Sequence, residues 1–180
     1  ALPALSGAEI LALTPAPAET EVLDFARLAG PHITPDHMWR LHQLIEQHVQ
    51  RPGLDGIVIT HGTDTLEETA YFLDLQHQHD LPVIVTGAMR NASHPGFDGP
   101  ANLHAALRVA LDPQSRGRGV LVAFNHTIHA ASAATKTDSQ ALETFQSPLF
   151  GPLGIIDHDR VLYYRRLESR QIIAAPGYEP

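Results

Sequence analysis

The chain has 180 residues and a formal net charge of −8, with 43% hydrophobic and 18% charged residues. This composition is typical of one well-buried globular domain, and the acidic balance with only 12 lysines and arginines argues against nucleic acid or an anionic membrane as a partner. The absence of cysteine excludes disulfides, thiolate catalysis and thiolate metal sites.

No apolar run approaches the roughly 20 residues of a membrane-spanning helix, and the first residues lack the basic start and apolar core of a signal peptide. We therefore expect a small-molecule ligand, with no nucleic acid and no membrane as partner. A chain without cysteine is compatible with either side of a membrane, so the compartment stays open, with the cytoplasm favoured.

The first 28 residues predict one helix and one strand. Ser6 can cap a short helix that runs to Leu13. Residues 20–28 alternate enough to predict a strand, in which Val22 and Phe25 are the expected buried residues.

A second helix has clearer start signals. Thr34 offers a capping hydroxyl, and Pro35 follows at the first helical position, where proline is favoured. The helix should end near Pro52 and Gly53. The apolar residues of this helix form one stripe, which comprises Met38, Leu41, Leu44, Ile45 and Val49.

Three short apolar runs predict buried strands. They span 57–59, 82–87 and 119–124, and each runs into small or polar residues. Since strands and helices alternate with short connections, we expect a three-layer α/β/α fold with a mainly parallel sheet. Residues 154–164 differ in character and predict a hairpin appended to this sheet, with its turn at 157–159.

A helix should follow each of the first two predicted strands. The first helix carries Glu67 and Glu68 in its first turn, where the helix dipole favours a carboxylate. The second begins at Pro100 and stops at Asp112 and Pro113. The expected apolar faces comprise Leu66, Ala70, Phe72 and Leu73 in the first helix and Leu103, Ala106, Leu107 and Ala110 in the second.

The turn from Thr60 to Thr65 is the first candidate for a functional site. Ligands of open α/β sheets bind beyond the carboxyl ends of the strands, so the hydroxyls of Thr60, Thr63 and Thr65 and the carboxylate of Asp64 would meet a ligand. The alternative is that Thr63, Asp64 or Thr65 merely caps the following helix, and on this turn alone that interpretation ranks slightly ahead.

Two further loops should converge with this turn. One begins at Ala88 after the second strand, and the other contains Lys136 beyond the third. A threonine hydroxyl needs a neighbouring base to react, and a lysine can become one when burial disfavours its ammonium form. Lys136 is the candidate because it is the only lysine in the chain, although composition alone favours a solvated surface charge equally.

Twelve histidines raise the question of a metal. The closest pairs are His126 with His129 and His77 with His79, and neither pair has a third ligand at a spacing typical of catalytic zinc. We expect solvated or hydrogen-bonded histidines and no metal. Glycine-rich phosphate-binding fingerprints are also missing. Among the other carboxylates considered as acids or bases, which are Asp24, Asp55, Asp98 and Asp138, only Asp98 lies in a candidate loop.

Four segments resemble one known family in the same order. His-Gly-Thr-Asp-Thr-Leu-Glu-Glu-Thr-Ala at 61–70 resembles the second signature of the bacterial-type L-asparaginase and glutaminase-asparaginase family. Val-Thr-Gly-Ala-Met-Arg at 85–90, Asp-Gly-Pro-Ala-Asn-Leu at 98–103 and Thr-Lys-Thr at 135–137 resemble it as well, and Gly-Pro-Leu-Gly at 151–154 also fits. The resemblance runs from the helix after Thr34 to residue 156 and is weaker before it.

The resemblance implies hydrolysis of the side-chain amide of L-asparagine by a threonine-dependent acyl-enzyme route without a metal or cofactor. Whether L-glutamine is a second substrate stays open. The resemblance assigns catalysis to Thr63, Asp64 and Lys136, with Lys136 and Asp64 tuning the hydroxyl of Thr63. It assigns substrate binding to Gly62, Thr63, Asp64, Ala88 and Pro31. Asp64 would accept from the α-ammonium group, the carbonyl of Ala88 would face the amide, and Pro31 stands where the family usually has a serine.

The resemblance also implies a place within a larger protein. Residues 1–165 correspond to the family's N-terminal α/β domain without its first strand and lid, and 166–180 to the start of the linker to a second domain. The family's first threonine signature, usually taken as the source of the nucleophile, is not among these residues, so we expect little or no activity from them alone. A homo-oligomer is implied as well, a dimer of dimers with sites shared between subunits.

Two other functions stay open at this point. One is the asparaginase-like subunit of a tRNA-dependent amidotransferase, which the acidic balance does not favour. The other is a non-catalytic amino-acid-binding module, in which Thr63 and Asp64 hold a ligand and nothing reacts. Substrate affinity without turnover would distinguish the binding module.

Overall fold

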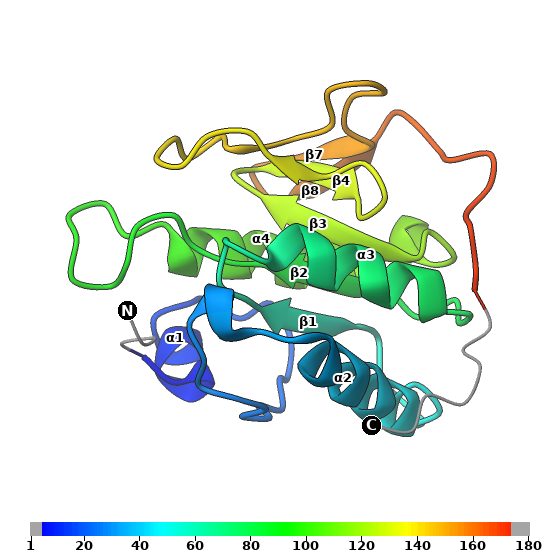
Figure 1. Ribbon diagram of the computed structural model, residues 1–180, viewed down its shortest axis with the longest axis horizontal. Coiled ribbons are helices and arrows are strands. Elements are labelled where there is room, and N and C mark those ends of the chain that lie inside the picture. Colours follow the sequence, from blue (N-terminus) through cyan, green and yellow to red (C-terminus); the bar gives the residue numbers. More distant parts are fainter. Residues whose placement is uncertain (1–4, 174–180) are drawn as a thin grey trace.

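The computed structural model describes residues 5–173 and has an α/β fold, which confirms the predicted class (Figure 1). In chain order the helices are α1 (Gly7–Ala12), η1 (Gly30–His32), α2 (Pro35–His48), α3 (Leu66–Gln76), α4 (Gly99–Leu111) and η2 (Pro113–Ser115), where η marks a 3-10 helix. The strands are β1 (Ile57–Thr60), β2 (Val83–Thr86), β3 (Val120–Phe124), β4 (Thr127–Ala130), β5 (Thr135–Lys136), β6 (Phe145–Gln146), β7 (Gly154–Asp157) and β8 (Arg160–Tyr163).

Within residues 5–173, six strands form one mixed sheet in the order β1-β2-β3-β4-β7-β8. β1, β2 and β3 are parallel, whereas β4, β7 and β8 add to them in antiparallel fashion. The prediction of a parallel sheet therefore holds for the half that carries the candidate loops. The predicted hairpin at 154–164 is confirmed as β7 and β8, and it extends the main sheet because β7 pairs with β4.

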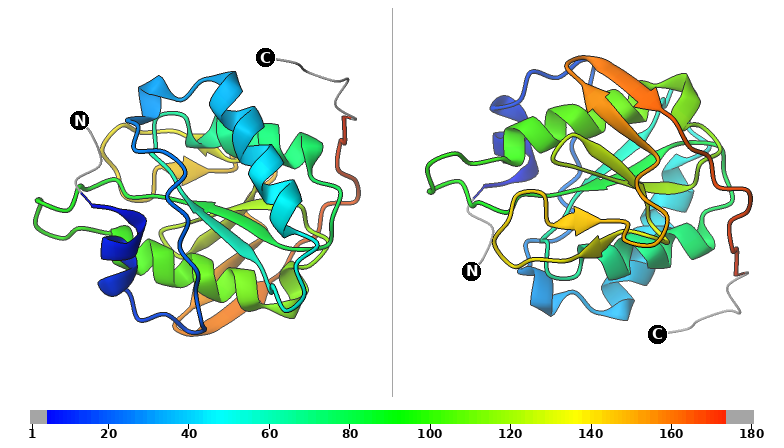
Figure 2. Two further views of the ribbon diagram at one scale, coloured as in Figure 1. Left: turned by 90° about the horizontal axis from the view of Figure 1, so that it is seen from below. Right: turned by 90° about the horizontal axis from the view of Figure 1, so that it is seen from above.

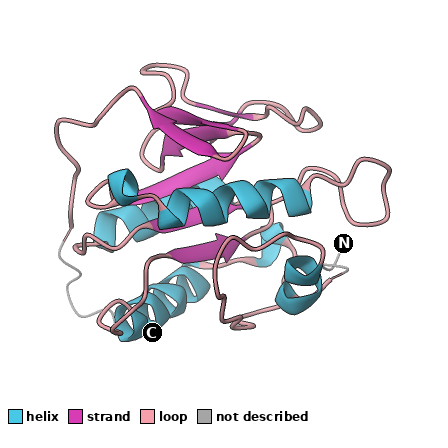
Figure 3. Ribbon diagram, turned by 180° about the vertical axis from the view of Figure 1, so that it is seen from behind, coloured by secondary structure: helices cyan, strands magenta, loops and turns pink. Residues whose placement is uncertain are grey.

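Helices cover both faces of this sheet (Figures 2 and 3). One core lies between the sheet and the helices α2 and α3, and the other lies between the sheet and α4. Successive residues of β2 show the alternation, since Val83 and Val85 belong to the first core and Ile84 to the second. Burial of these two apolar sets holds the three layers together.

The helix starts follow from local chemistry. Ser6 and Glu9 form a capping box at α1, and Thr34 forms one with His37 at α2, with Pro35 in the first turn as predicted. In the predicted stripe of α2, the side chains of Met38, Leu41 and Ile45 are buried, and Leu44 and Val49 are partly buried.

Full burial of the strand at 57–59 is a prediction that proved wrong. Ile57, Val58 and Ile59 are only partly buried, because β1 is the edge strand of the sheet within the described residues. β2 and β3 lie inside the sheet, and every residue of both strands is buried as predicted.

Two further differences concern strands. The strand predicted at 20–28 does not form, Val22 is exposed, and Phe25 packs against the core from a loop. β4, in contrast, was not predicted, and it follows a tight turn in which Asn125 and His126 have positive φ angles of 45° and 61°. Both differences arise because a strand needs a pairing partner, which a local pattern does not reveal.

The segment after β8 has no helix or strand in its described part, which ends at 173. It runs back to the C-terminal end of α3, where the Ile173 N–H donates to the carbonyl of Leu75 at 2.8 Å. Of the predicted linker at 166–180, residues 174–180 lie outside the described residues, as do residues 1–4 of the predicted domain. The helices between 5 and 173 are too short or too polar to cross a membrane.

Candidate active site

The turn from Thr60 to Thr65 follows β1 and leads into α3, as predicted. Thr65 occupies the N-cap position of α3, but its side chain makes no capping bond and donates to the carbonyl of Gly30 at 2.7 Å. Gly30 is packed so closely that an added Cβ would lie 3.2 Å from the Cβ of Asp64. The turn is therefore fastened to the loop before α2, and helix capping does not explain the hydroxyl of Thr65.

Lys136 reaches this turn from a separate two-stranded sheet of β5 and β6. The hairpin lies over the α3 side of the main sheet, where Phe145 of β6 packs against Phe124 with ring centroids 4.9 Å apart. Lys136 Nζ lies 2.9 Å from Thr63 Oγ1 and 2.9 Å from Asp64 Oδ1. Two segments more than 70 positions apart in the sequence therefore converge as one hydrogen-bonded group.

Exposure divides this group into a covered side and an open side. The side chain of Lys136 is 18% exposed, whereas that of Asp64 is 57% exposed. The interpretation of Lys136 as a solvated surface charge is therefore wrong. A shallow hollow of about 270 Å³ opens beside the ion pair and is lined by Asp64, Lys136, Thr137, Asp138 and Ser139.

Glu67 joins the hairpin to the first turn of α3. Its Oε1 accepts from the hydroxyl of Thr135 at 3.0 Å, and its Oε2 accepts a short hydrogen bond from the backbone N–H of Lys136. This contact between α3 and β5 was not predicted from the sequence, in which Glu67 had only the role of a carboxylate at a helix N-terminus.

The loop that begins at Ala88 lies beside the same turn and extends past the N-terminal end of α4 (Figure 1). Asp98 holds its start by accepting from the backbone N–H groups of Met89 at 3.0 Å and Arg90 at 2.9 Å. Gly87 abuts the turn, since an added Cβ would come within 2.4 Å of the carbonyl oxygen of His61. Ala88 is partly buried and is the next residue along the chain.

Asn102 links this loop to β3. Its side-chain amide donates to the carbonyl of Gly87 at 2.9 Å and to Asp98 at 3.0 Å, and its carbonyl oxygen accepts from the Asn125 N–H at 3.0 Å. The carboxylate of Asp98 is thus occupied by loop and helix donors. A structural role accounts for this aspartate better than the acid or base role considered from the sequence.

Two other residues of the predicted binding set flank the turn. Gly62 packs against Gly30, where an added Cβ would lie 3.0 Å from the Gly30 Cα. Pro31 is the next residue in η1 and is exposed. The loop of Pro31 is thus adjacent to Asp64, while the assignment of Pro31 itself to substrate binding stays a prediction.

Two histidines beside or within the core are held by hydrogen bonds. His129 is fully buried, and its Nδ1 lies 2.8 Å from Ser147 Oγ; burial lowers the pKa of His129 to about 4. His61 next to the site bonds to Thr69 Oγ1 at 2.9 Å, and burial lowers its pKa as well. Across the described residues, no group of three potential ligands could hold a metal ion.

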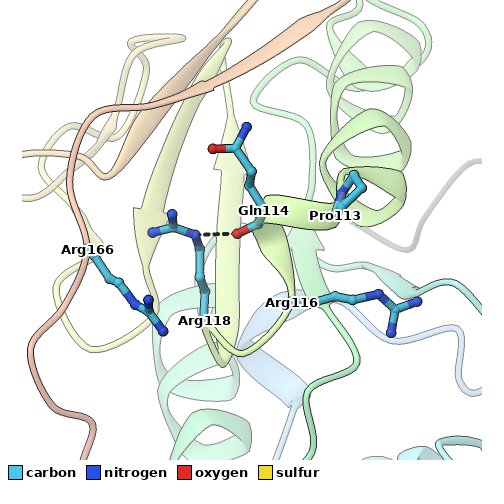
Figure 4. A pocket seen from close by; sticks show the side chains of 5 residues that line it. All are labelled: Pro113, Gln114, Arg116, Arg118 and Arg166. Atoms are coloured by element: carbon cyan, nitrogen blue, oxygen red, sulfur yellow. Dashed lines mark hydrogen bonds between the residues drawn. The ribbon is translucent and has the colours of Figure 1, made fainter.

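A second hollow lies at the opposite end of the parallel strands (Figure 4). It is lined by Pro113, Gln114, Arg116, Arg118 and Arg166. Arg118 is committed to packing, since its guanidinium lies 3.9 Å from the ring centroid of Tyr163 and donates to the carbonyls of Gln114 and Arg165. None of the predicted site residues lines this hollow, and it lacks the hydroxyl and carboxylate of the first.

Fold and site together define an α/β protein that presents a threonine hydroxyl, a carboxylate and a lysine amine at the carboxyl ends of parallel strands. Residues 1–169 match the family model described as "Asparaginase, N-terminal". The chain therefore belongs to the asparaginase family.

Individual relatives agree with this membership. The chain is 44% identical over 174 residues to "Probable L-asparaginase" of Deinococcus radiodurans, covering 94% of this chain and 50% of the relative. It is 49% identical over 142 residues to "Probable L-asparaginase periplasmic" of Haemophilus influenzae, covering 78% and 40%. This chain therefore spans about half the length of such curated relatives, or less.

A solved structure shows the same fold. The crystal structure of "Probable Cytoplasmic L-asparaginase" from Campylobacter jejuni matches with a TM-score of 0.87 and 35% identity, covering 91% of this chain and 53% of that one. Because one relative is named periplasmic and this neighbour cytoplasmic, membership of the family does not decide the compartment.

Proposed function

We propose that the protein, at its full natural length, hydrolyses the side-chain amide of L-asparagine to L-aspartate and ammonia. The observation that carries the proposal is the contact of Lys136 Nζ with both Thr63 Oγ1 and Asp64 Oδ1, at 2.9 Å each. Family membership supports it, since relatives that match most of this chain are named L-asparaginase. L-Glutamine is a second candidate substrate, on the basis of the family resemblance.

In the proposed reaction, Lys136 and Asp64 tune the hydroxyl of Thr63 along the hydrogen bonds that join them. The amide carbon forms an ester with a threonine hydroxyl, the carbon–nitrogen bond breaks, and the nitrogen leaves as ammonia. Water then cleaves the ester and supplies the second oxygen of the new carboxylate. This sequence of bonds needs no metal and no organic cofactor.

The proposed substrate contacts follow from exposure. Asp64 has one oxygen bonded to Lys136, and its 57% exposed side chain can accept from the α-ammonium group of an amino acid as well. Gly62, Thr63, Ala88 and Pro31 complete the proposed binding set, with the carbonyl of Ala88 facing the substrate amide. Contacts of Gly30 and Gly87 with the turn at 60–65 support this set, because they join the loops of all five residues.

We further propose the domain and oligomer arrangement that the resemblance implies, with an α/β domain at 1–165, the start of a linker at 166–180, and a dimer of dimers with shared sites. The shallow hollow beside Asp64 supports sharing, because a small substrate would need a further wall to be enclosed. Leu149 and Phe150 are 88% and 67% exposed, which favours an interface between subunits. The molar mass of the full-length protein from light scattering tests the tetramer.

The experiment that tests the function is ammonia release from L-asparagine and L-glutamine by the full-length protein. Thr63→Ala and Lys136→Ala should each lower the rate by about 10³-fold or more, because both remove a reacting or tuning group. Arg166→Ala is the matched control, since it removes an exposed positive charge far from the site and should leave the rate unchanged.

Circular dichroism shows whether each variant is folded. An inactive full-length protein that still binds asparagine would overturn the hydrolase and favour a binding module. Full activity in folded Lys136→Ala would overturn the assignment of Lys136.

A further inference from the structure

Lys136 sits on a hairpin that the main sheet does not include. β5 and β6 contain two residues each and pair only with one another among the described strands. A two-stranded ribbon of this length has little stability of its own. The position of Lys136 Nζ at the turn of Thr63 must therefore be secured by contacts outside the ribbon.

The backbone of Lys136 faces outward from this ribbon. The Thr137 N–H donates to the carbonyl of Thr144 at 2.8 Å across the ribbon. Because inward and outward N–H groups alternate along an antiparallel strand, the N–H of Lys136 points away from β6. It is there that the carboxylate of Glu67 accepts it.

Glu67 commits both carboxylate oxygens to this one segment. One accepts from the hydroxyl of Thr135 at 3.0 Å and the other from the Lys136 N–H. Glu67 belongs to α3, whose N-terminal end begins directly after the turn that carries Thr63 and Asp64. One helix therefore connects the backbone of Lys136 to the two groups that its amine contacts.

We propose that Glu67 is a positioning residue, which holds the backbone of Lys136 so that Nζ bridges Thr63 and Asp64. The effect of Glu67 on the reaction rate rests on the proposed amide hydrolysis. The anchoring of the Lys136 backbone does not depend on that proposal. Glu67 contacts neither Thr63 nor Asp64 in the structure's hydrogen bonds, so it acts through Lys136.

Substitutions at Glu67 separate anchoring from charge. Glu67→Ala removes both acceptors, whereas Glu67→Gln keeps one carbonyl oxygen and replaces the other acceptor with a donor. A displacement of a reacting group by about 1 Å can cost about 10²-fold in rate. We therefore expect kcat to fall by about 10² in Glu67→Ala and by about 10-fold in Glu67→Gln.

Glu68→Ala is the matched control, because Glu68 is the neighbouring carboxylate in the same first turn and is exposed. It should change kcat by less than about 2-fold, as surface substitutions usually do. Glu67→Ala should also cost little further when Lys136 is already alanine, since residues that act through one another are not additive. A full and independent loss in the Lys136→Ala background would overturn the proposal.

Chemical labelling gives a readout without turnover. The rate at which a pulse of acetic anhydride acetylates Lys136 can be followed by mass spectrometry of the peptide that contains it, which has no other lysine within residues 1–180. The side chain of Lys136 is 18% exposed when anchored. Release by Glu67→Ala or Glu67→Gln should raise the labelling rate several-fold, and Glu68→Ala should not change it.

The two readouts keep the proposals apart. If the full-length protein releases no ammonia, the proposed function fails, and the labelling rates still decide whether Glu67 anchors Lys136. Equal labelling of Lys136 in the unmodified protein and in folded Glu67→Gln would overturn the anchor. Should Glu67→Ala fail to fold, Glu67→Gln carries the comparison.

Discussion

The two ends of α3 each carry an aspartate paired with a basic residue, and the two pairs do different things. Before the helix, Asp64 pairs with Lys136 at 2.9 Å, with side chains 57% and 18% exposed. In its last turn, Asp74 pairs with Arg170 at 2.9 Å, with side chains 4% and 15% exposed. The two pairs therefore have equal distances but differ in burial, and burial decides what each pair contributes to stability or to ligand binding.

At the buried end the carboxylate and its arginine are used for structure. Asp74 also accepts from the Val120 N–H at 2.9 Å, and Arg170 donates to the backbone carbonyls of Asp74 and His77. The pair fastens the segment after β8 to α3 and β3. At the other end, Asp64 shares Lys136 with the hydroxyl of Thr63, and the side chain of Asp64 stays exposed. The carboxylate of Asp64 can therefore also accept from a ligand.

The largest expected effect is the loss of the buried pair. Arg170→Ala leaves the carboxylate of Asp74 buried without its cation, and breaking such a pair costs about 4 kcal/mol in the free energy of unfolding. Urea unfolding followed by circular dichroism measures the loss. The rate of ammonia release from protein that remains folded should stay within about 2-fold of the original, since Arg170 lies at the far end of α3.

The control for this substitution is Arg166→Ala, which removes an exposed arginine four residues earlier. It should change stability by less than about 0.5 kcal/mol. A urea midpoint that shifts equally in both variants would contradict the distinction between a structural and a surface cation.

The second prediction extends the comparison to a buried polar group away from α3. Burial lowers the pKa of His129 from 6.5 in an ordinary setting to about 4. The folded state therefore favours the neutral ring, and this contribution is complete above pH 6.5 and lost as the pH falls from 6.5 toward 4. As the pH falls from 7 to 4, protonation of His129 should lower the free energy of unfolding by about 3 kcal/mol.

Urea unfolding at a series of pH values, with and without His129→Gln, isolates that contribution. The difference in the free energy of unfolding between the unmodified and His129→Gln proteins should shrink as the pH falls, because protonation of buried His129 destabilises only the unmodified chain. His94→Gln, in an exposed turn, is the control. Parallel pH curves for the unmodified and His129→Gln proteins would show that His129 does not titrate on unfolding.

The smallest expected effect concerns the open end of α3. Thr65→Val removes the hydrogen bond at 2.7 Å to the carbonyl of Gly30, which should cost about 1 kcal/mol of stability. Because this bond fastens the loop of Pro31 to the turn, KM for asparagine should rise more than kcat falls.

Thr20→Val provides the comparison for Thr65→Val, since the exposed hydroxyl of Thr20 donates locally, to the carbonyl of Ala18. Its stability and KM should be unchanged. A fall in kcat with constant KM in Thr65→Val would place Thr65 with the reacting groups instead of the binding loop.

Local signals predicted the parallel half of the fold well. Thr34 with Pro35 marked the start of α2, and the apolar runs of β2 and β3 indicated strands covered on both faces. These features depend on neighbouring residues, so the pattern contains them. β4 escaped prediction because Thr127–Ala130 has no strong strand pattern and becomes a strand only between β3 and β7. Residues 20–28 are the converse case, because they have a strand pattern but no strand to pair with.

The candidate site was predictable to a similar degree. The position of Thr63 and Asp64 after a strand predicted a ligand-facing turn, and the single lysine of the chain suggested Lys136. Glu67 could not be identified, because a carboxylate in a first helical turn normally needs no partner beyond the helix dipole. Its contact with β5 depends on how a separate hairpin packs across α3.

By itself, the sequence determined the α/β class, the order of strands and helices in the parallel half, and the loops that carry the candidate site residues. These follow from hydrophobic periodicity and turn chemistry, which act over a few residues. Only the tertiary structure decided that Asp64 stays open while Asp74 is buried, and that Glu67 holds the backbone of Lys136. Burial and long-range contacts depend on which elements pack together, and residues almost 70 positions apart meet only once the chain has folded.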